Sequence, residues 1–209
     1  MSEEDFFPGT ADDALARLMA GNERFVSGRA RPGPSGPATE LVAHQNPFAT
    51  VLGCSDSRVP LELLFDVGFG DLFVIRVAGN VMLPAVMGSI QYAGVHLHTP
   101  LLMILGHEGC GAVKAALAAM HEGAVERSRI QVLLDSIKPG LEALPPDTPP
   151  DQLLRQGVEA NVRWSMHQLL DTPEGRHRLA EGHLKLVGGV YELATGRVRL
   201  LDGGLAPGS

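Results

Sequence analysis

Residues 101–110 read Leu-Leu-Met-Ile-Leu-Gly-His-Glu-Gly-Cys. The first five of them form an unbroken apolar run, which is typical of a β-strand that is buried on both faces. Pro100 comes before the run, and Gly106 ends it immediately before His107. Two similar apolar runs occur earlier in the chain, at Phe48–Leu52 and Leu72–Val77.

Segments with helical character lie between and after these runs, at Leu61–Asp66, Ala85–His96 and Ala112–His121. Strands buried on both faces that alternate with helices indicate a parallel sheet covered by helices on both sides. We therefore predict an α/β fold with a central, mainly parallel β-sheet flanked by helices.

Both ends of the chain are predicted to add further elements to this core. At the start, Thr10 is a candidate N-cap for a helix over Ala11–Val26, and Gly28–Pro37 is predicted to be an extended arm. Further on we expect two amphipathic helices, a Pro-rich linker between them and a terminal hairpin, at Val125–Ile137, Asp151–Leu170, Leu144–Pro150, and Leu184–Tyr191 with Arg197–Leu201. We expect one domain over 1–209, with 1–37 as its N-terminal helix and arm.

The composition excludes several classes of protein. Of the 209 residues, 44% are hydrophobic and 20% are charged, which argues against a mainly disordered chain. The net charge of −7 argues against a nucleic-acid partner, and no apolar run approaches the ~18–20 residues of a membrane span. The acidic N-terminus is unlike a signal peptide, and two cysteines cannot form a disulfide framework. We therefore expect a cytoplasmic protein.

Both cysteines are predicted to follow strand ends, where ligands gather in open α/β folds. Cys54 follows the first apolar run, and His107 and Cys110 follow the third. Two thiolates and one imidazole are a suitable ligand set for Zn²⁺ that leaves a fourth position for water. A Cys54–Cys110 disulfide and two inert buried thiols are the alternatives, but neither accounts for the histidine three residues before Cys110.

Cys54 also begins the motif Cys-Ser-Asp-Ser-Arg at 54–58. Alternation along an extended loop places Cys54, Asp56 and Arg58 on one side. There the guanidinium of Arg58 can hold the Asp56 carboxylate ionised and oriented through a bidentate pair. The alternative is an exposed loop ion pair of little energetic consequence.

The two motifs together make the chain resemble the β-class carbonic anhydrases over nearly its whole length. The family's C-x-D-x-R motif matches Cys54, Asp56 and Arg58, and its H-x-x-C motif matches His107 and Cys110. Three further stretches support the resemblance, at 17–25, 73–80 and 89–93.

The resemblance implies one zinc ion per chain, bound by Cys54, His107 and Cys110. Asp56 would be an alternative fourth ligand that yields to water when it pairs with Arg58. The implied reaction is the reversible hydration of carbon dioxide to bicarbonate and a proton by metal-bound hydroxide, with Asp56 and Arg58 as catalytic residues. A homodimer or higher homo-oligomer is implied as well, because family members build the site across a dimer interface.

The resemblance also assigns five residues to the substrate. Gln45 matches a glutamine whose amide can donate to a bicarbonate oxygen, and the backbone N–H of Gly111 could also meet substrate. Phe73, Ala78 and Tyr92 match positions that line a small carbon dioxide pocket. Core packing is the alternative for these three residues, and a plain loop position is the alternative for Gln45.

Position 51 bears on the subclass and on the state of the site. Family members that bicarbonate switches off carry Trp three residues before the first cysteine ligand, whereas this chain has Val51. It therefore resembles the plant-type subclass, and we expect an open site at about pH 7–8 with Asp56 paired to Arg58. Two other functions stay open: hydrolysis of a molecule similar to carbon dioxide, such as carbon disulfide, and a non-enzymatic zinc protein with a permanently closed Cys₂HisAsp site.

Overall fold

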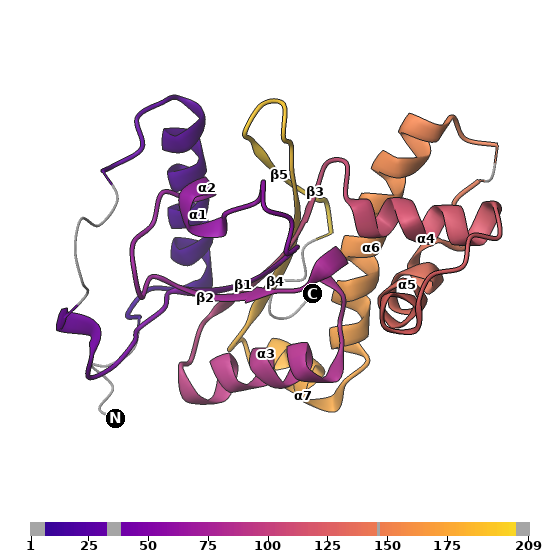
Figure 1. The fold of residues 1–209 in the computed structure, drawn as a ribbon. Helices are drawn as coiled ribbons and strands as arrows, with labels where there is room; N and C mark the ends of the chain where they lie inside the picture. Colours follow the sequence, from indigo (N-terminus) through magenta and orange to yellow (C-terminus); the bar gives the residue numbers. More distant parts are fainter. Residues whose placement is uncertain (1–6, 33–38, 146, 204–209) are drawn as a thin grey trace.

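The computed structural model describes residues 7–32, 39–145 and 147–203, and Figure 1 shows its fold. The strands form one sheet in the order β2-β1-β3-β4-β5. Neighbouring strands from β2 to β4 pair in parallel, and β5 runs antiparallel to β4. The strands are β1 (Ala49–Gly53), β2 (Leu72–Arg76), β3 (Leu101–His107), β4 (Lys185–Tyr191) and β5 (Val198–Leu200). The predicted α/β class with a mainly parallel sheet is confirmed.

The helices agree with the sequence prediction to within a few residues, with two exceptions. They are α1 (Ala11–Val26), α2 (Leu61–Leu64), α3 (Pro84–His96), α4 (Gly111–His121), α5 (Ser128–Leu141), α6 (Pro150–Leu170) and α7 (Pro173–Ala180), with short 3₁₀ turns η2 (Thr39–Leu41) and η3 (Ala78–Asn80). The first exception is α5, which continues past Ile137 through Pro139, because burial of Leu141 holds its last turn in place. The second is α7, which the sequence analysis missed although Thr172 caps it and Pro173 begins it.

The predicted hairpin is present, but its first strand has a larger role than a hairpin arm. β4 pairs in parallel with all seven residues of β3, from Leu101↔Lys185 to His107↔Tyr191. It is therefore an interior strand, and the sheet continues on its other side into β5 through the turn at Thr195-Gly196.

Helices cover both faces of the sheet, as Figure 1 shows. Alternate residues of β3 point to opposite faces. Leu101, Met103 and Leu105 pack in one buried cluster with residues of α1 and α2, whereas Leu102 and Ile104 pack in another with residues of α3 to α7. The apolar run of β3 is therefore unbroken because both of its faces lie in a hydrophobic core.

Polar contacts attach α1 to the rest of the fold. A capping box between Thr10 and Asp13 begins the helix. Near its end, buried Asn22 donates from Nδ2 to the carbonyls of Leu64 and Gly196 and accepts from the Val198 backbone N–H at 2.8 Å. One side chain therefore joins α1 to α2 and to the β4–β5 hairpin.

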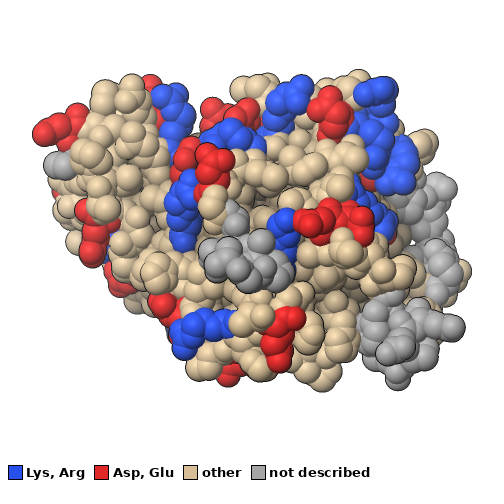
Figure 2. Space-filling model, turned by 180° about the vertical axis from the view of Figure 1, so that it is seen from behind, with Lys and Arg blue, Asp and Glu red and all other residues tan. Residues whose placement is uncertain are grey.

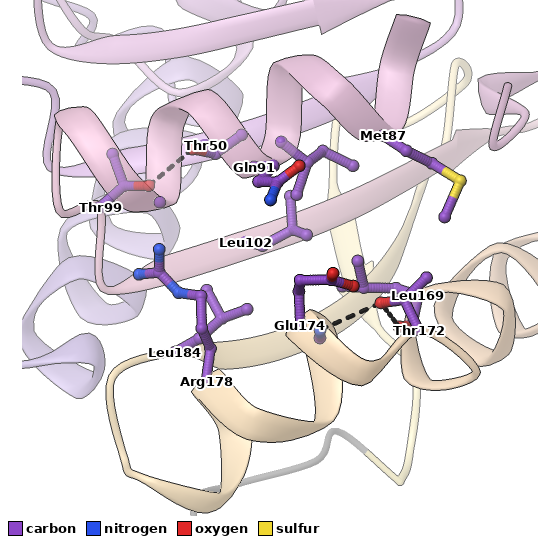
Figure 3. Close-up of a pocket in the computed structure, with 13 residues that line it drawn as sticks. Thr50, Met87, Gln91, Thr99, Leu102, Leu169, Thr172, Glu174, Arg178 and Leu184 are labelled. Carbon is purple, nitrogen blue, oxygen red and sulfur yellow. Dashed lines mark hydrogen bonds between the residues drawn. The ribbon is translucent and has the colours of Figure 1, made fainter. Parts of the chain in front are cut away.

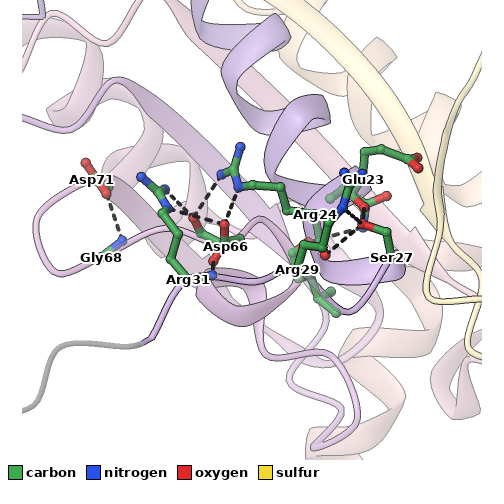
Figure 4. A network of polar contacts seen from close by, with 10 residues as sticks. Glu23, Arg24, Ser27, Arg29, Arg31, Asp66, Gly68 and Asp71 are labelled. Carbon is green, nitrogen blue, oxygen red and sulfur yellow. Dashed lines mark hydrogen bonds and ion pairs between the residues drawn. The ribbon is translucent and has the colours of Figure 1, made fainter.

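A buried carboxylate attaches the segment that follows α1. Figure 4 shows Asp66 between Arg24 of α1 and Arg31. The Arg31 backbone N–H donates to Asp66 Oδ1 at 2.8 Å, and its guanidinium donates to the Asp66 carbonyl at 2.7 Å. The described part of the predicted arm is thus anchored at Arg31, and its residues 33–37 lie outside the described residues.

Acidic and basic side chains are interspersed on the face shown in Figure 2. Ion pairs of the described residues include Arg199 with Glu159 at 2.7 Å. Within residues 7–32, 39–145 and 147–203, no helix is both long and apolar enough to cross a membrane.

Candidate metal centre

The candidate ligands come together where neighbouring parallel strands end. Gly53, the last residue of β1, is paired with Leu105 in β3. Cys54 therefore lies beside the carboxyl end of β3. His107 is the final residue of β3, and Cys110 is the N-cap of α4. The ligand atoms of Cys54, His107 and Cys110 lie within 4.8 Å of one another, and all three residues are buried. The predicted convergence is confirmed.

His107 is held in the tautomer that a metal ligand needs. Its Nδ1 lies 2.9 Å from the backbone carbonyl of Glu108, and because a carbonyl only accepts, Nδ1 carries the proton. The lone pair is therefore on Nε2, which is fully buried and has no hydrogen-bond partner within the described part of the chain. A metal-ligating histidine commonly donates its other N–H to such a group.

The two sulfurs are free thiol groups rather than a disulfide. A hydrogen bond from Cys110 lowers the pKa of Cys54, with smaller contributions from His107 and from the Gly79 backbone N–H, 3.3 Å from Sγ. Cys54 is therefore poised as a thiolate. The same hydrogen bond raises the pKa of Cys110, as do burial and the charge of Cys54, so Cys110 is the donor of the pair, and the backbone N–H groups of Val113 and Ala112 in the first turn of α4 offset this only in part.

Asp56 and Arg58 form the fork that the motif suggests. Arg58 Nε and Nη2 donate to Asp56 Oδ1 and Oδ2 at 2.9 and 2.8 Å, and the Arg58 backbone N–H adds a bond of 2.9 Å to Oδ1. The side-chain hydrogen bond from Arg58 holds the pKa of Asp56 well below its usual range. Asp56 Oδ2 lies 3.9 Å from His107 Nε2, so the paired carboxylate stands at the edge of the ligand cluster.

Arg76, at the end of β2, fixes the backbone of the same loop. Its guanidinium donates to the carbonyls of Cys54 and Asp56 at 3.1 and 2.7 Å. The backbone of Cys54, a candidate ligand, and that of Asp56 are therefore positioned by one side chain from a neighbouring strand.

A buried network behind Cys54 was missed by the sequence analysis. Gly79 has a left-handed φ of 74°, which glycine adopts at little cost, and this conformation presents its N–H to Cys54. From α6, Asn161 Nδ2 donates to the Gly79 carbonyl at 2.8 Å, and Ser165 Oγ donates to the Asn80 carbonyl at 3.1 Å. Two buried polar residues on the apolar face of α6 were the available signal.

The five predicted substrate residues fall into two groups within one chain. Ala78 directly precedes Gly79, and Gly111 directly follows Cys110, so both lie beside the ligands. Phe73, near the start of β2, stacks on Tyr92 of α3 with ring centroids 6.1 Å apart. Gln45 is exposed in the segment that leads into β1. Those three residues lie toward the amino ends of the strands, whereas the ligands lie at the carboxyl ends.

Comparisons with known proteins agree with this arrangement. Residues 49–198 match the family model described as carbonic anhydrase. "Carbonic anhydrase 2" of Mycobacterium tuberculosis is 39% identical to this chain over 90% of it and 92% of the relative. A carbonic anhydrase of Mycolicibacterium smegmatis is 40% identical over 90% and 91% of the two chains.

Solved structures extend the likeness to the fold. The β-carbonic anhydrase CcaA is 26% identical, with a TM-score of 0.70 over 94% of this chain and 93% of that one. A β-carbonic anhydrase from Sordaria macrospora, described as tetrameric, shares the fold with a TM-score of 0.70 at 24% identity, over 93% of this chain and 100% of that one. On this evidence the chain is an enzyme and belongs to the β-carbonic anhydrase family.

Proposed function

We propose that the protein catalyses the zinc-dependent, reversible hydration of carbon dioxide to bicarbonate and a proton at the centre formed by Cys54, His107 and Cys110. The observation that carries this proposal is the buried His107 Nε2, which has no hydrogen-bond partner among the described residues, on a ring whose ligand atom lies within 4.8 Å of both sulfurs. An imidazole lone pair beside two thiol groups matches a zinc ligand set.

The chemistry of these donors fits zinc rather than a harder cation. Thiolate and imidazole ligands suit Zn²⁺, whereas Mg²⁺ and Ca²⁺ prefer oxygen. Zn–S and Zn–N bonds of about 2.0–2.3 Å require ligand atoms within a few ångströms of one another, and these three gather within 4.8 Å. When bound at such ligands, Zn²⁺ supplies a hydroxide nucleophile near neutral pH.

The chain's own residues then position that nucleophile. The Asp56 carboxylate can accept a hydrogen bond from it and so direct a lone pair toward carbon dioxide. Arg58 keeps Asp56 ionised and aimed through its two-bond fork. The ion pair between Asp56 and Arg58 is also the feature that favours catalysis over a closed structural site, in which Asp56 would be a zinc ligand.

A second copy of the chain completes the site in this proposal. The amino ends of the strands, away from the candidate ligands of the same chain, are where Gln45, Phe73 and Tyr92 lie. Tyr92 is 48% exposed despite its apolar ring. β2 is an edge strand of the sheet (Figure 1), so these residues can face a partner. We therefore propose a homodimer or higher homo-oligomer in which these residues serve the partner's zinc centre.

Stopped-flow measurement of carbon dioxide hydration tests the reaction. Zinc-loaded protein should hydrate carbon dioxide far faster than buffer, and the matched control His121→Ala, on the exposed end of α4, should do the same. If the protein holds one zinc per chain but accelerates neither the hydration of carbon dioxide nor the hydrolysis of carbon disulfide, the result contradicts an enzymatic site. Activity on carbon disulfide alone would replace the proposed substrate.

Sedimentation of a Tyr92→Glu variant tests the assembly separately. A carboxylate on that exposed ring position should dissociate the oligomer and reduce hydration while each chain keeps its zinc. Full activity in a monomeric variant would overturn the shared site without touching the zinc assignment.

A further inference from the structure

We propose that the cavity between α3 and α7 is a second binding site, which takes a small monovalent carboxylate through Arg178. The cavity has a volume of about 100 Å³ and lies on the face of the sheet that these two helices cover (Figure 3). None of the residues that line it belongs to the metal centre, and the proposal does not depend on the proposed reaction.

Arg178 is the lining residue with an unsatisfied hydrogen-bond donor. Its side chain is partly buried, and Nε is fully buried with no hydrogen-bond partner. The only hydrogen bond of its guanidinium within the described residues is a long one, 3.5 Å from Nη2 to the His183 carbonyl, and no described carboxylate lies within 4.0 Å. A guanidinium stays charged in proteins, and the charge of Glu181, which is not within 4.0 Å of it, offsets the cost of its burial only in part.

The neighbouring helix is shaped to admit this charge. A Cβ on Gly94 of α3 would lie 1.9 Å from Arg178 Nη1, so glycine leaves the space that the guanidinium occupies. Burial in this position opposes the charged form and lowers the pKa of Arg178. In Figure 3 the guanidinium rises from α7 toward α3 and toward the threonine pair Thr50 and Thr99.

The threonine pair offers a second donor. Thr50 and Thr99 are both buried, and their hydroxyl oxygens lie 2.8 Å apart. Two hydroxyls carry two hydrogens, and the bond between them uses one. The other hydroxyl hydrogen remains available to an acceptor in the cavity, so the polar groups at this end are hydrogen-bond donors.

The rest of the lining defines the ligand class. Met87, Ile90 and Leu102 give the cavity an apolar wall, which suits a short hydrocarbon tail better than an inorganic phosphate. The carboxylate of Glu174 lies at the other end of the cavity, turned toward Leu169 and Thr172 in Figure 3. It would repel a dianion that reached this end, whereas a monocarboxylate bound at Arg178 would present only its uncharged tail there. A volume of about 100 Å³ equals several water-sized probes, enough for a molecule such as propionate.

The test is titration of the zinc-loaded, full-length protein with propionate at constant ionic strength, followed by ligand-observed NMR with chloride as the reference anion. Arg178→Gln should weaken propionate binding about 10-fold or more, since charge-assisted hydrogen bonds are lost. Gly94→Ala should weaken it as well although every charge is kept. The matched control Arg176→Gln, which removes an exposed charge from the same helix, should change it by less than about twofold.

All three variants should keep the carbon dioxide hydration rate of the parent, which shows that they fold. Absence of saturable propionate binding to the parent would overturn the proposal. So would binding that Arg178→Gln leaves unchanged, and its loss in a Cys110→Ser variant would then assign the carboxylate to the metal centre.

Discussion

Replacing Asn161 by Ala should weaken zinc binding although Asn161 is no ligand. The side chain is only 1% exposed, and its Nδ2 donates to the Gly79 carbonyl at 2.8 Å. The N–H of the same glycine lies 3.3 Å from Cys54 Sγ. Asn161 therefore fixes the turn that holds a donor against the first cysteine ligand.

The structure allows the size of the effect to be worked out. The substitution leaves the buried Gly79 carbonyl without this donor, which costs about 1–3 kcal/mol of stability. Loss of Oδ1 removes no direct hydrogen bond to the described part of the chain. Once Gly79 is free to turn away, Cys54 loses its backbone donor, and losses of such outer contacts lower metal affinity roughly 10–100-fold.

Competition with a chelator measures the zinc affinity, and the absorption spectrum of the cobalt-substituted protein reports on the thiolate ligands. Ser165→Ala is the matched control, because Ser165 donates to the next carbonyl of the same turn, that of Asn80. It should cost about 1 kcal/mol of stability and leave the zinc affinity intact. Equal zinc affinity in Asn161→Ala and the parent protein, or equal losses in both variants, would refute the reasoning.

Four further predictions concern Cys110, Gln45, Asp66 and Asp56. Cys110→Ser should lose both zinc and activity, and metal analysis that finds one zinc per chain in this variant would reject the ligand assignment. Gln45→Ala should keep its zinc but lower kcat/KM about twofold to tenfold, the value of one lost hydrogen bond; an unchanged kcat/KM returns it to an ordinary loop residue. Burial raises the pKa of Asp66, but the hydrogen bonds and charges of Arg24 and Arg31 lower it by a larger amount. The net result is a pKa below the usual 3.8. Its ion pairs therefore stabilise the fold above about pH 4 and are lost as the pH falls below that, so the melting temperatures of Asp66→Asn and the parent should differ at neutral pH and converge in acid. Near pH 8, Asp56 should stay paired with Arg58, and metal-edge spectroscopy that finds its carboxylate at ~2.0–2.2 Å from zinc would contradict an open site.

The strands β1 to β3 and the meeting of the three candidate ligands were predictable because local sequence determines them. An apolar run buried on both faces, as in Leu101–Leu105, needs no distant information to be identified as an interior strand. Parallel strands end at one edge of a sheet, so residues that directly follow them, such as Cys54 and His107, meet there whatever the details of the loops. The bidentate geometry of Asp56 and Arg58 was predictable from their spacing.

The elements that were missed depend on contacts between distant parts of the chain. The sequence 173–180 is polar, with a glycine at 175, and it forms α7 because Leu179 is buried against the sheet-covering helices. The alignment of β4 with β3 joins residues about eighty positions apart, and no local pattern distinguishes it from an isolated hairpin. The same holds for Asn161, whose partner Gly79 lies 82 residues away.

Buried side-chain atoms without a partner link the two proposed sites. In the described part of the chain these atoms are Asn80 Nδ2, His107 Nε2, Asn161 Oδ1, Gln168 Oε1 and Arg178 Nε. Asn80 Nδ2 is a donor within the η3 turn, and Asn161 Oδ1 is an acceptor on the side chain that bonds to that turn, and a bridging water suits such a pair. His107 Nε2 differs, because its neighbours are two sulfurs and a carboxylate already held by Arg58, a surrounding that favours a cation. Arg178 Nε differs in the opposite sense, because it belongs to a charged donor group in a cavity that Thr50 and Thr99 also line, which is why we propose an anion there. Buried atoms without a hydrogen-bond partner therefore support both proposals, a cation at the carboxyl ends of the strands and an anion on one face of the sheet. The neighbouring groups determine which charge each site would bind.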